Sequence, residues 1–163
     1  MGDRVTPESV NQANTEVPVL GIKALRRTMT VCSEEHVQVV DLTKQIRDVV
    51  REVDVTQGLL AVNSLHTTCA LFVNEFQGAL IEDLLTMLRQ LVADKDEYRH
   101  DDPRYSDCER GNASAHLRAA LVGRSVVVGI SGGELSLGRF QSILFAELDG
   151  PRSRDIDIQL FGV

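Results

Sequence analysis

The pattern of apolar and polar positions in the first third of the chain predicts two strands followed by a helix. Residues 19–33 are rich in β-branched side chains and alternate over Thr28–Val31, and a second strand is predicted at residues 36–42. Thr43 is the predicted N-cap of the helix, because the apolar residues after it recur at the helical spacing i, i+3, i+4, i+7. These residues are Ile46, Val49, Val50 and Val53.

Two short apolar runs and a long amphipathic segment come next. Residues 59–63 and 68–73 predict strands on either side of His66 and Thr67. A helix is predicted from Gly78, and its broad apolar face is expected to point into the core. The residues of this face are Leu80, Ile81, Leu84, Leu85, Leu88, Leu91 and Val92.

A charged segment at residues 94–111 is the longest predicted loop, and it contains His100. Loops of this length in a compact domain are usually functional or disordered. Asn112 is a predicted N-cap for a helix over residues 113–121 that Gly123 would end. His116 would then lie in the first two turns of that helix.

Four further strands are predicted in the last third of the chain, at residues 125–130, 134–137, 140–147 and 155–161. Strands lie at both ends of the chain, and three helices interrupt them without regular β-α-β alternation. This order predicts an α+β fold with a largely antiparallel sheet or β-sandwich and three flanking helices. Residues 19–163 are expected to form one domain, and residues 1–18 a flexible polar tail.

Composition narrows the class of protein and the range of partners. The 163 residues are 43% hydrophobic but only 4% aromatic, so the core must be mainly aliphatic. A net charge of −7 argues against nucleic acid or an anionic membrane as the main partner, although it allows a local basic pocket for a small anion. The three cysteines show no Cys-x-x-Cys spacing and fit a reducing compartment. With no apparent signal peptide or membrane span, we expect a cytoplasmic protein.

Three of the four histidines, His66, His100 and His116, lie in the polar middle of the chain. Three imidazoles with one open coordination position would hold zinc and acidify a bound water, so these residues suggest a metal site. The competing interpretation is that His100 is a solvated loop residue and His116 a surface residue near a helix cap. The spacing alone does not decide between the two.

Other polar residues have a similar double interpretation. Glu75 could serve as a general base or orient a ligand, or be a solvated turn residue. Asn112 and His116 share a helix face, so that one can orient the other. Arg152 and Arg154 follow glycine-containing turns and could bind phosphate, but composition alone favours two hairpin turns with a few salt bridges.

Taken together, these motifs and their order resemble the YjbQ family, also called secondary thiamine-phosphate synthase proteins. The resemblance runs from about residue 20 to the C-terminus. The matching residues are His66-Thr67-Thr68, Asn74-Glu75, Tyr98-x-His100, Asp107, Asn112-x-x-x-His116, Gly133-x-Leu135-x-Leu137-Gly138, Gln141 and Glu147-x-Asp149-Gly150-Pro151-Arg152-x-Arg154. One departure is Phe140, where the family usually has Trp, so a contact through an indole N–H is lost here.

The resemblance implies a compact homotrimer of α+β subunits with a metal-binding site. His66, His100 and His116 would be the zinc ligands, and Glu75, Asp107 and Asn112 the catalytic neighbours. Substrate would be bound by four further residues, Thr67, Gln141, Arg152 and Arg154.

The implied activity is that of a thiamine-phosphate synthase-like enzyme, which joins a pyrimidine diphosphate to a thiazole phosphate and releases pyrophosphate. Imidazole ligands favour zinc, whereas pyrophosphate release usually uses oxygen-bound magnesium, so a zinc-dependent phosphate-ester hydrolase is an alternative. A non-catalytic trimeric module that binds a metal or anion is a second alternative.

Overall fold

The computed structural model describes residues 21–163, so the predicted tail at residues 1–18 lies outside the described part of the chain. Each of the eight predicted strands corresponds to an observed one. The strands are β1 (Lys23–Cys32), β2 (Gln38–Asp41), β3 (Gln57–Ser64), β4 (Cys69–Asn74), β5 (Ser125–Ser131), β6 (Glu134–Leu135), β7 (Ser142–Glu147) and β8 (Ser153–Gly162). The helices are α1 (Thr43–Val53), α2 (Gly78–Leu91), α3 (Ala113–Val122) and the short 3₁₀ turn η1 (Arg99–Asp101).

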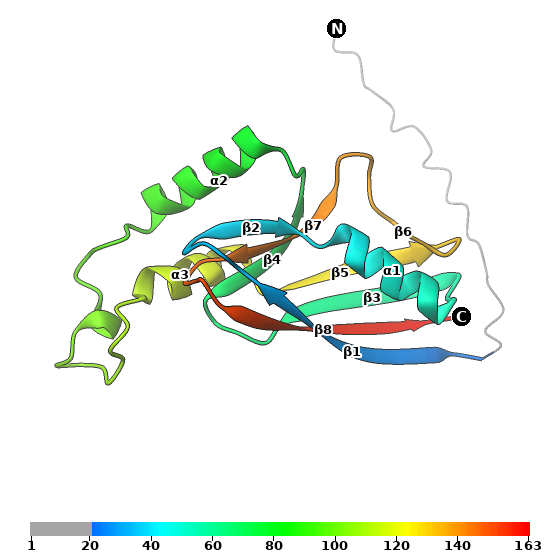
Figure 1. Cartoon of the computed structure of the whole chain (residues 1–163), viewed down its shortest axis with the longest axis horizontal. Coiled ribbons are helices and arrows are strands. Elements are labelled where there is room, and N and C mark those ends of the chain that lie inside the picture. The colour runs from blue at the N-terminus through cyan, green and yellow to red at the C-terminus, as the bar shows by residue number, and fades with distance from the viewer. Residues whose placement is uncertain (1–20) are drawn as a thin grey trace, which may run out of the picture.

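The strands form two antiparallel sheets that face each other (Figure 1). One sheet has the order β1-β8-β3-β5-β6 and the other the order β2-β7-β4. The long strand β8 is central to the first sheet because it pairs with β1 on one side and with β3 on the other. The fold is therefore α+β and largely a sandwich, which confirms the class predicted from the sequence.

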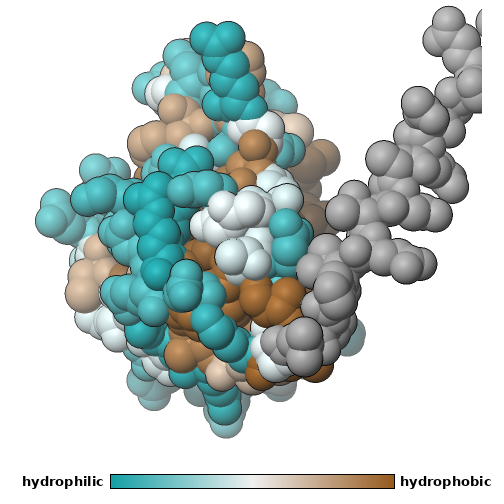
Figure 2. All heavy atoms as spheres, turned by 90° about the vertical axis from the view of Figure 1, so that its right-hand side faces the viewer, coloured by the Kyte–Doolittle hydropathy of each residue, from teal (hydrophilic) through white to brown (hydrophobic). Residues whose placement is uncertain are grey.

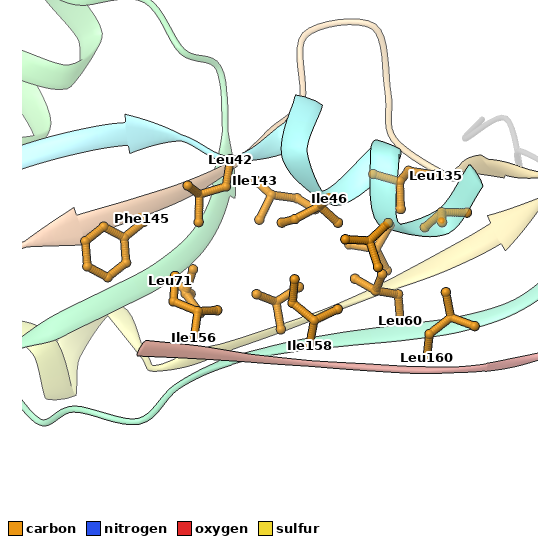
Figure 3. Close-up of a cluster of buried hydrophobic side chains, with 14 of the residues drawn as sticks. Leu42, Ile46, Leu60, Leu71, Leu135, Ile143, Phe145, Ile156, Ile158 and Leu160 are labelled. Atoms are coloured by element: carbon orange, nitrogen blue, oxygen red, sulfur yellow. The ribbon is translucent and has the colours of Figure 1, made fainter. Parts of the chain in front are cut away.

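The main core lies between the two sheets and is mostly aliphatic (Figure 3). Alternate residues of β8 point inward, so Ile156, Ile158 and Leu160 are fully buried. Ile143 and Phe145 of β7 face them from the smaller sheet. The aliphatic core expected from the composition is thus observed, with Phe145 as its largest fully buried side chain.

Helix α1 extends the layer of the smaller sheet and covers the remainder of the larger one (Figure 1). Its predicted stripe is largely buried, since Ile46, Val49 and Val50 belong to the core. The predicted cap is wrong by one residue: Leu42 occupies the N-cap position, and Thr43 is the first helical residue. Asp41 Oδ1 accepts hydrogen bonds from the Thr43 amide and hydroxyl, so an aspartate performs the capping that the sequence assigned to Thr43.

Helix α2 does not face the core as predicted. It stands away from the two sheets (Figure 1), and Leu88 is its one fully buried residue. On the predicted apolar face, Leu91 is largely exposed, and Leu80, Ile81, Leu84 and Leu85 are only half-buried. The apolar periodicity identified a helix correctly but could not reveal that, within one chain, little packs against that face.

Helix α3 packs on the outer face of the smaller sheet. Ala115 and Ala119 contact Ala70 and Ala146 there, and these small side chains bring the helix close to the strands. Arg118 on this helix is buried and donates to the Val92 carbonyl, which fixes the C-terminal end of α2.

The outer surfaces are mainly polar. Seen from the end at which β8 terminates, hydrophilic side chains dominate, and apolar ones gather in a limited area (Figure 2). On the outer face of the larger sheet, Leu59, Val127 and Phe161 are exposed. None of the helices within residues 21–163 is long and apolar enough to cross a membrane.

Candidate functional site

A cavity of about 390 Å³ lies at one end of the sandwich, where three connections meet. These are the β3–β4 connection, the turn between β7 and β8, and the loop that leads into α3. The cavity is lined by Leu65, His66, Thr67, Thr68, His100, Cys108, Arg110, Asn112, His116, Asp149 and Arg154. All three predicted histidines therefore line the same cavity, together with three of the other predicted residues, Thr67, Asn112 and Arg154.

Arg154, which lines the cavity, belongs to a buried ion pair that joins the two sheets. Arg154 of β8 donates from Nε to Glu147 Oε2 at 2.6 Å and from Nη2 to Glu147 Oε1 at 2.7 Å. Arg154 Nη2 also donates to Thr68 Oγ1 at 2.9 Å. The hydrogen bond to Glu147 is the main reason why the pKa of Arg154 is raised further above its ordinary value. Arg154 is therefore a fixed positive charge at the cavity.

The carboxylate of Glu147 is also held by the backbone that follows it. The amides of Leu148 and Asp149 donate to Glu147 Oε1 at 3.0 and 2.8 Å. A fully buried carboxylate is costly unless its charge and lone pairs are satisfied, and here an arginine and two amides satisfy them. Glu147 is therefore a positioning group beneath the cavity.

Asp149 links the β7–β8 turn to the start of α3. Its Oδ2 accepts hydrogen bonds from Asn112 Nδ2 at 2.9 Å and from Arg152 Nη2 at 3.2 Å. Arg152 also donates from Nε to the Asp149 carbonyl at 2.7 Å. Arg152, which the sequence suggested for substrate phosphate, thus holds Asp149 and does not line the cavity.

Asn112 is at the N-cap position of α3 as predicted, but its side chain makes no capping hydrogen bond. Asp101 Oδ1 accepts from the Ala113 amide at 2.9 Å and serves as the cap from the neighbouring η1 turn. This contact ties η1 to α3. It therefore also places His100, the residue before Asp101, against the helix.

His100 and His116 form the central contact of the site. Their ring centroids are 4.9 Å apart and the ring planes are nearly perpendicular at 88°. The Nε2 atom of His100 is buried and has no hydrogen-bond partner within residues 21–163. Burial, and next the nearby charge of His100, lower the pKa of His116 below its ordinary value. The ring of His116 thus favours the neutral form, which can accept a proton or a metal ion.

His66 is held differently from the other two histidines. Its Nε2 accepts a hydrogen bond from the Asp155 amide at 2.9 Å. Within residues 21–163, no three His, Cys, Asp or Glu side chains are placed together so that they could hold a metal ion. Of the three histidines, His100 and His116 lie together, and His66 as positioned here does not join them.

Glu75 and Gln141 lie at the opposite end of the β4–β7 pair. The cavity end of this pair has Cys69 opposite Glu147, and the far end has Asn74 opposite Ser142. Five residue steps along a strand are roughly 17 Å, so Glu75 and Gln141 are remote from the cavity of the same chain. Gln141 Oε1 accepts from the Gly138 amide at 2.8 Å. Asp107 is exposed and is not among the residues that line the cavity.

Five residues that line the cavity were not among the predicted site residues: Leu65, Thr68, Cys108, Arg110 and Asp149. Thr68 and Asp149 belong to the motifs that resemble the YjbQ family, and Arg110 to the charged loop. The half-buried Cys108 thiol lies 3.7 Å from Asn112 Oδ1. Cys108 and Arg110 could have been identified from the sequence, because they lie just before Asn112. Residues next to a helix N-terminus in the chain also lie near it in space.

The family profile described as "UPF0047 protein YjbQ-like" matches residues 27–163. The chain belongs to this family. A UPF0047 protein from Archaeoglobus fulgidus is 40% identical over 131 residues, which are 80% of this chain and 97% of the relative. The UPF0047 protein YugU of Bacillus subtilis is 28% identical over 137 residues, which are 83% of this chain and 98% of the relative.

Solved structures of YjbQ-like proteins have the same fold. A YbjQ-like protein of unknown function from Sulfolobus solfataricus P2 superposes with a TM-score of 0.80 at 29% identity, covering 88% of this chain and all of the other. A hypothetical protein from Aeropyrum pernix K1 gives a TM-score of 0.78 at 36% identity, covering 85% of this chain and 99% of the other. The resemblance to the YjbQ family and the α+β fold that it implied are therefore confirmed.

Proposed function

We propose that this YjbQ-like protein is an enzyme that acts on a small phosphorylated molecule in the cavity beside His100 and His116. The single observation that carries the proposal is the buried, unpartnered Nε2 of His100 next to His116, in a cavity that is also lined by two arginines. A polar atom that is buried without a partner is costly, and a bound ligand would satisfy it. Paired guanidinium groups are suited to phosphate oxygens.

The two arginines have different parts in this proposal. Arg154 uses Nε and Nη2 for Glu147 and Thr68, which leaves Nη1 for a ligand. Arg110 is exposed and lies at the cavity without an ion-pair partner in the described part of the chain. Arg154 would therefore provide fixed charge, and Arg110 an adaptable contact at the opening.

A zinc ion is part of the proposal, held by His100 and His116. Imidazole nitrogens suit zinc, and the unpartnered nitrogen of His100 is the atom most in need of a ligand. Bound zinc supplies a Lewis acid that neutralises phosphate charge and lowers the pKa of water. The chain's own residues would bind the phosphate through the arginines, and His116, whose pKa is lowered by burial, would present a neutral nitrogen to the ion.

Hydrolysis of a phosphate ester is the reaction that best fits these residues. It needs a phosphate site and an activated water. The arginines would provide the first, and an ion held by His100 and His116 would provide the second, with the released proton passing to solvent. Asn112 and Asp149 complete the wall and orient each other through their 2.9 Å hydrogen bond. Glu75, Asp107 and Gln141 have no part in this site within one chain.

Thiamine-phosphate synthase-like activity is the second candidate, favoured by the family resemblance and by space for a larger substrate. A neighbouring hollow of about 400 Å³ shares His66, Thr67 and His116 with the cavity and extends along α3. Ala119 and Ala120 make part of its wall apolar, which suits a heterocyclic ring.

A homotrimer is included in the proposal. Leu59, Val127 and Phe161 on the larger sheet, and Met87 and Leu91 on α2, leave apolar surface exposed in one chain. Contact between subunits would cover such surface. Sedimentation velocity of the purified protein tests this part, and a single monomeric species at micromolar concentration would contradict it.

The test of activity is turnover of a panel of phosphate monoesters, and of the pyrimidine diphosphate with the thiazole phosphate, by zinc-loaded protein. His100→Ala and His116→Ala should each lower kcat/KM by at least about 100-fold, because each would remove a ligand of an ion that contributes several kcal/mol of transition-state charge stabilisation. His36→Ala is the matched control because His36 does not line this cavity and bonds to the Gly150 carbonyl instead. Equal turnover by all variants would refute the proposed site.

A further inference from the structure

The position of His66 at the end of β3 determines which of its ring nitrogens carries a proton. Strand β3 pairs with β8 as far as Ser64 opposite Ile156. The Leu65 amide then donates to the Asp155 carbonyl at 3.2 Å, and the Asp155 amide donates to His66 Nε2 at 2.9 Å. The imidazole thus accepts the next hydrogen bond of the β3–β8 pairing, where a backbone carbonyl would otherwise be the acceptor.

A backbone amide is always a hydrogen-bond donor, so the atom that accepts from it must present a lone pair. Nε2 of His66 is therefore unprotonated, and in the neutral ring the proton is on Nδ1. Neither nitrogen of His66 is then free to bind a metal, because one lone pair faces the amide and the other atom carries hydrogen. His100 differs in this respect, since its buried Nε2 has no partner within the described residues.

The peptide segment that carries His66 is also fixed. The His66 amide donates to Ser64 Oγ at 3.2 Å, and this hydroxyl lies 2.8 Å from Cys69 Sγ. Ser64 and Cys69 are both fully buried, so the two residues anchor the connection between β3 and β4. The ring lines the same cavity as Arg154, whose guanidinium is held to Thr68 on the same connection.

We propose that His66 binds the anionic part of the ligand as a hydrogen-bond donor through Nδ1–H, and that it is not a metal ligand. This inference rests on the proposed function, because it assigns His66 to the phosphate while His100 and His116 hold the ion. An imidazole N–H next to two arginines adds a directional donor to a site of otherwise diffuse positive charge. The cavity is thereby divided into an anion-binding side at His66 and Arg154 and a metal-binding side at His100 and His116.

Two titrations on the full chain test this division, one with zinc alone and one with inorganic phosphate. In His66→Ala, zinc affinity should stay within about twofold of the unchanged protein, whereas phosphate affinity should fall roughly tenfold, as expected for loss of one hydrogen bond to a charged group. In His100→Ala, zinc affinity should fall at least about tenfold. Loss of zinc from His66→Ala to the same extent as from His100→Ala would overturn the inference.

His66→Asn serves as the conservative variant, because its side-chain amide places an N–H near the position of Nδ1. It should recover part of the phosphate affinity that His66→Ala loses, and no recovery would contradict a donor role. Nitrogen-15 spectra of the histidine rings in the unmodified protein provide a readout that needs no ligand. We expect His66 Nε2 to resonate as an unprotonated nitrogen and Nδ1 as a protonated one, and the reverse pattern would overturn the inference.

The outcomes also separate this inference from the function proposed above. If the unmodified protein binds neither zinc nor phosphate, the proposed function fails, while the ring spectra still decide the state of His66. If zinc and phosphate bind but His66→Ala loses both, the proposed function stands and the donor role of His66 fails.

Discussion

The guanidinium of Arg154 in the larger sheet donates two hydrogen bonds to the carboxylate of Glu147 in the smaller sheet. Nε lies 2.6 Å from Oε2, and Nη2 lies 2.7 Å from Oε1. Both side chains are almost completely inaccessible, at 7% and 0% exposure. The pair therefore joins the two sheets at the end where the cavity lies. Its charge and geometry support both the fold and the proposed phosphate site.

Replacement of Glu147 by alanine should destabilise the protein by about 3–5 kcal/mol, because Arg154 would remain buried without its counter-charge. Denaturant unfolding followed by circular dichroism gives the free energy of unfolding. Glu134→Ala is the matched control, since Glu134 pairs with Arg51 on the surface at a similar distance of 2.8 Å. That exposed pair should contribute less than about 1 kcal/mol. Equal effects of the two substitutions would contradict a structural role for the buried pair.

Asp101→Ala should destabilise the protein by about 1 kcal/mol, because the α3 N-terminus would lose the side chain that accepts from the Ala113 amide. Asp101→Asn keeps a capping oxygen and should recover most of this loss. Glu109→Ala in the same loop is the control, as Glu109 is exposed and does not cap a helix. If Asp101→Ala unfolds at the same denaturant concentration as the control, the cap is not formed in solution.

Acid should destabilise the protein in part through Asp157. Its side chain is only 4% exposed, and hydrogen bonds from Arg26, and next from Gln159, hold the pKa of its carboxyl below the ordinary value. Because the pKa is lower in the folded than in the unfolded protein, this contribution to stability is complete above the ordinary pKa. It is lost as the pH falls through the folded value.

Asp157→Asn should therefore lower stability at neutral pH and reduce the further loss below about pH 4. The measurement is the free energy of unfolding as a function of pH for both proteins. Parallel profiles over the acid range would show that Asp157 does not carry this dependence.

The alternation of apolar and polar residues predicted the strands well, because a strand of a sandwich buries only one of its two faces. The alternation of Ile156, Ile158 and Leu160 is an example, since period-two burial is a direct consequence of strand geometry. The apolar face of α2 was predicted to be in the core, but it is not. A periodic pattern shows that a face is apolar without showing whether the same chain covers it.

The candidate site was predicted in part. His66, His100 and His116 do line one cavity, but the sequence could not show that the Asp155 amide occupies His66 Nε2. That contact depends on where β3 ends relative to β8. Likewise, the residue type of Arg152 suggested a phosphate ligand. In the structure, its guanidinium donates a hydrogen bond to Asp149, three residues earlier in the chain. Whether such a side chain is available to a ligand depends on how distant strands pair and on which charged groups meet. The spacing of residues along the chain shows neither.

The central claim is that zinc and phosphate bind together in the cavity beside His100 and His116. Diffraction from crystals soaked in zinc and inorganic phosphate, recorded at the zinc absorption edge, tests it most directly. We expect an anomalous peak next to His100 Nε2 and the His116 ring, with phosphate density against Arg110 and Arg154. A cavity without an anomalous peak, or a peak at the far end of β4 beside Glu75, would contradict it.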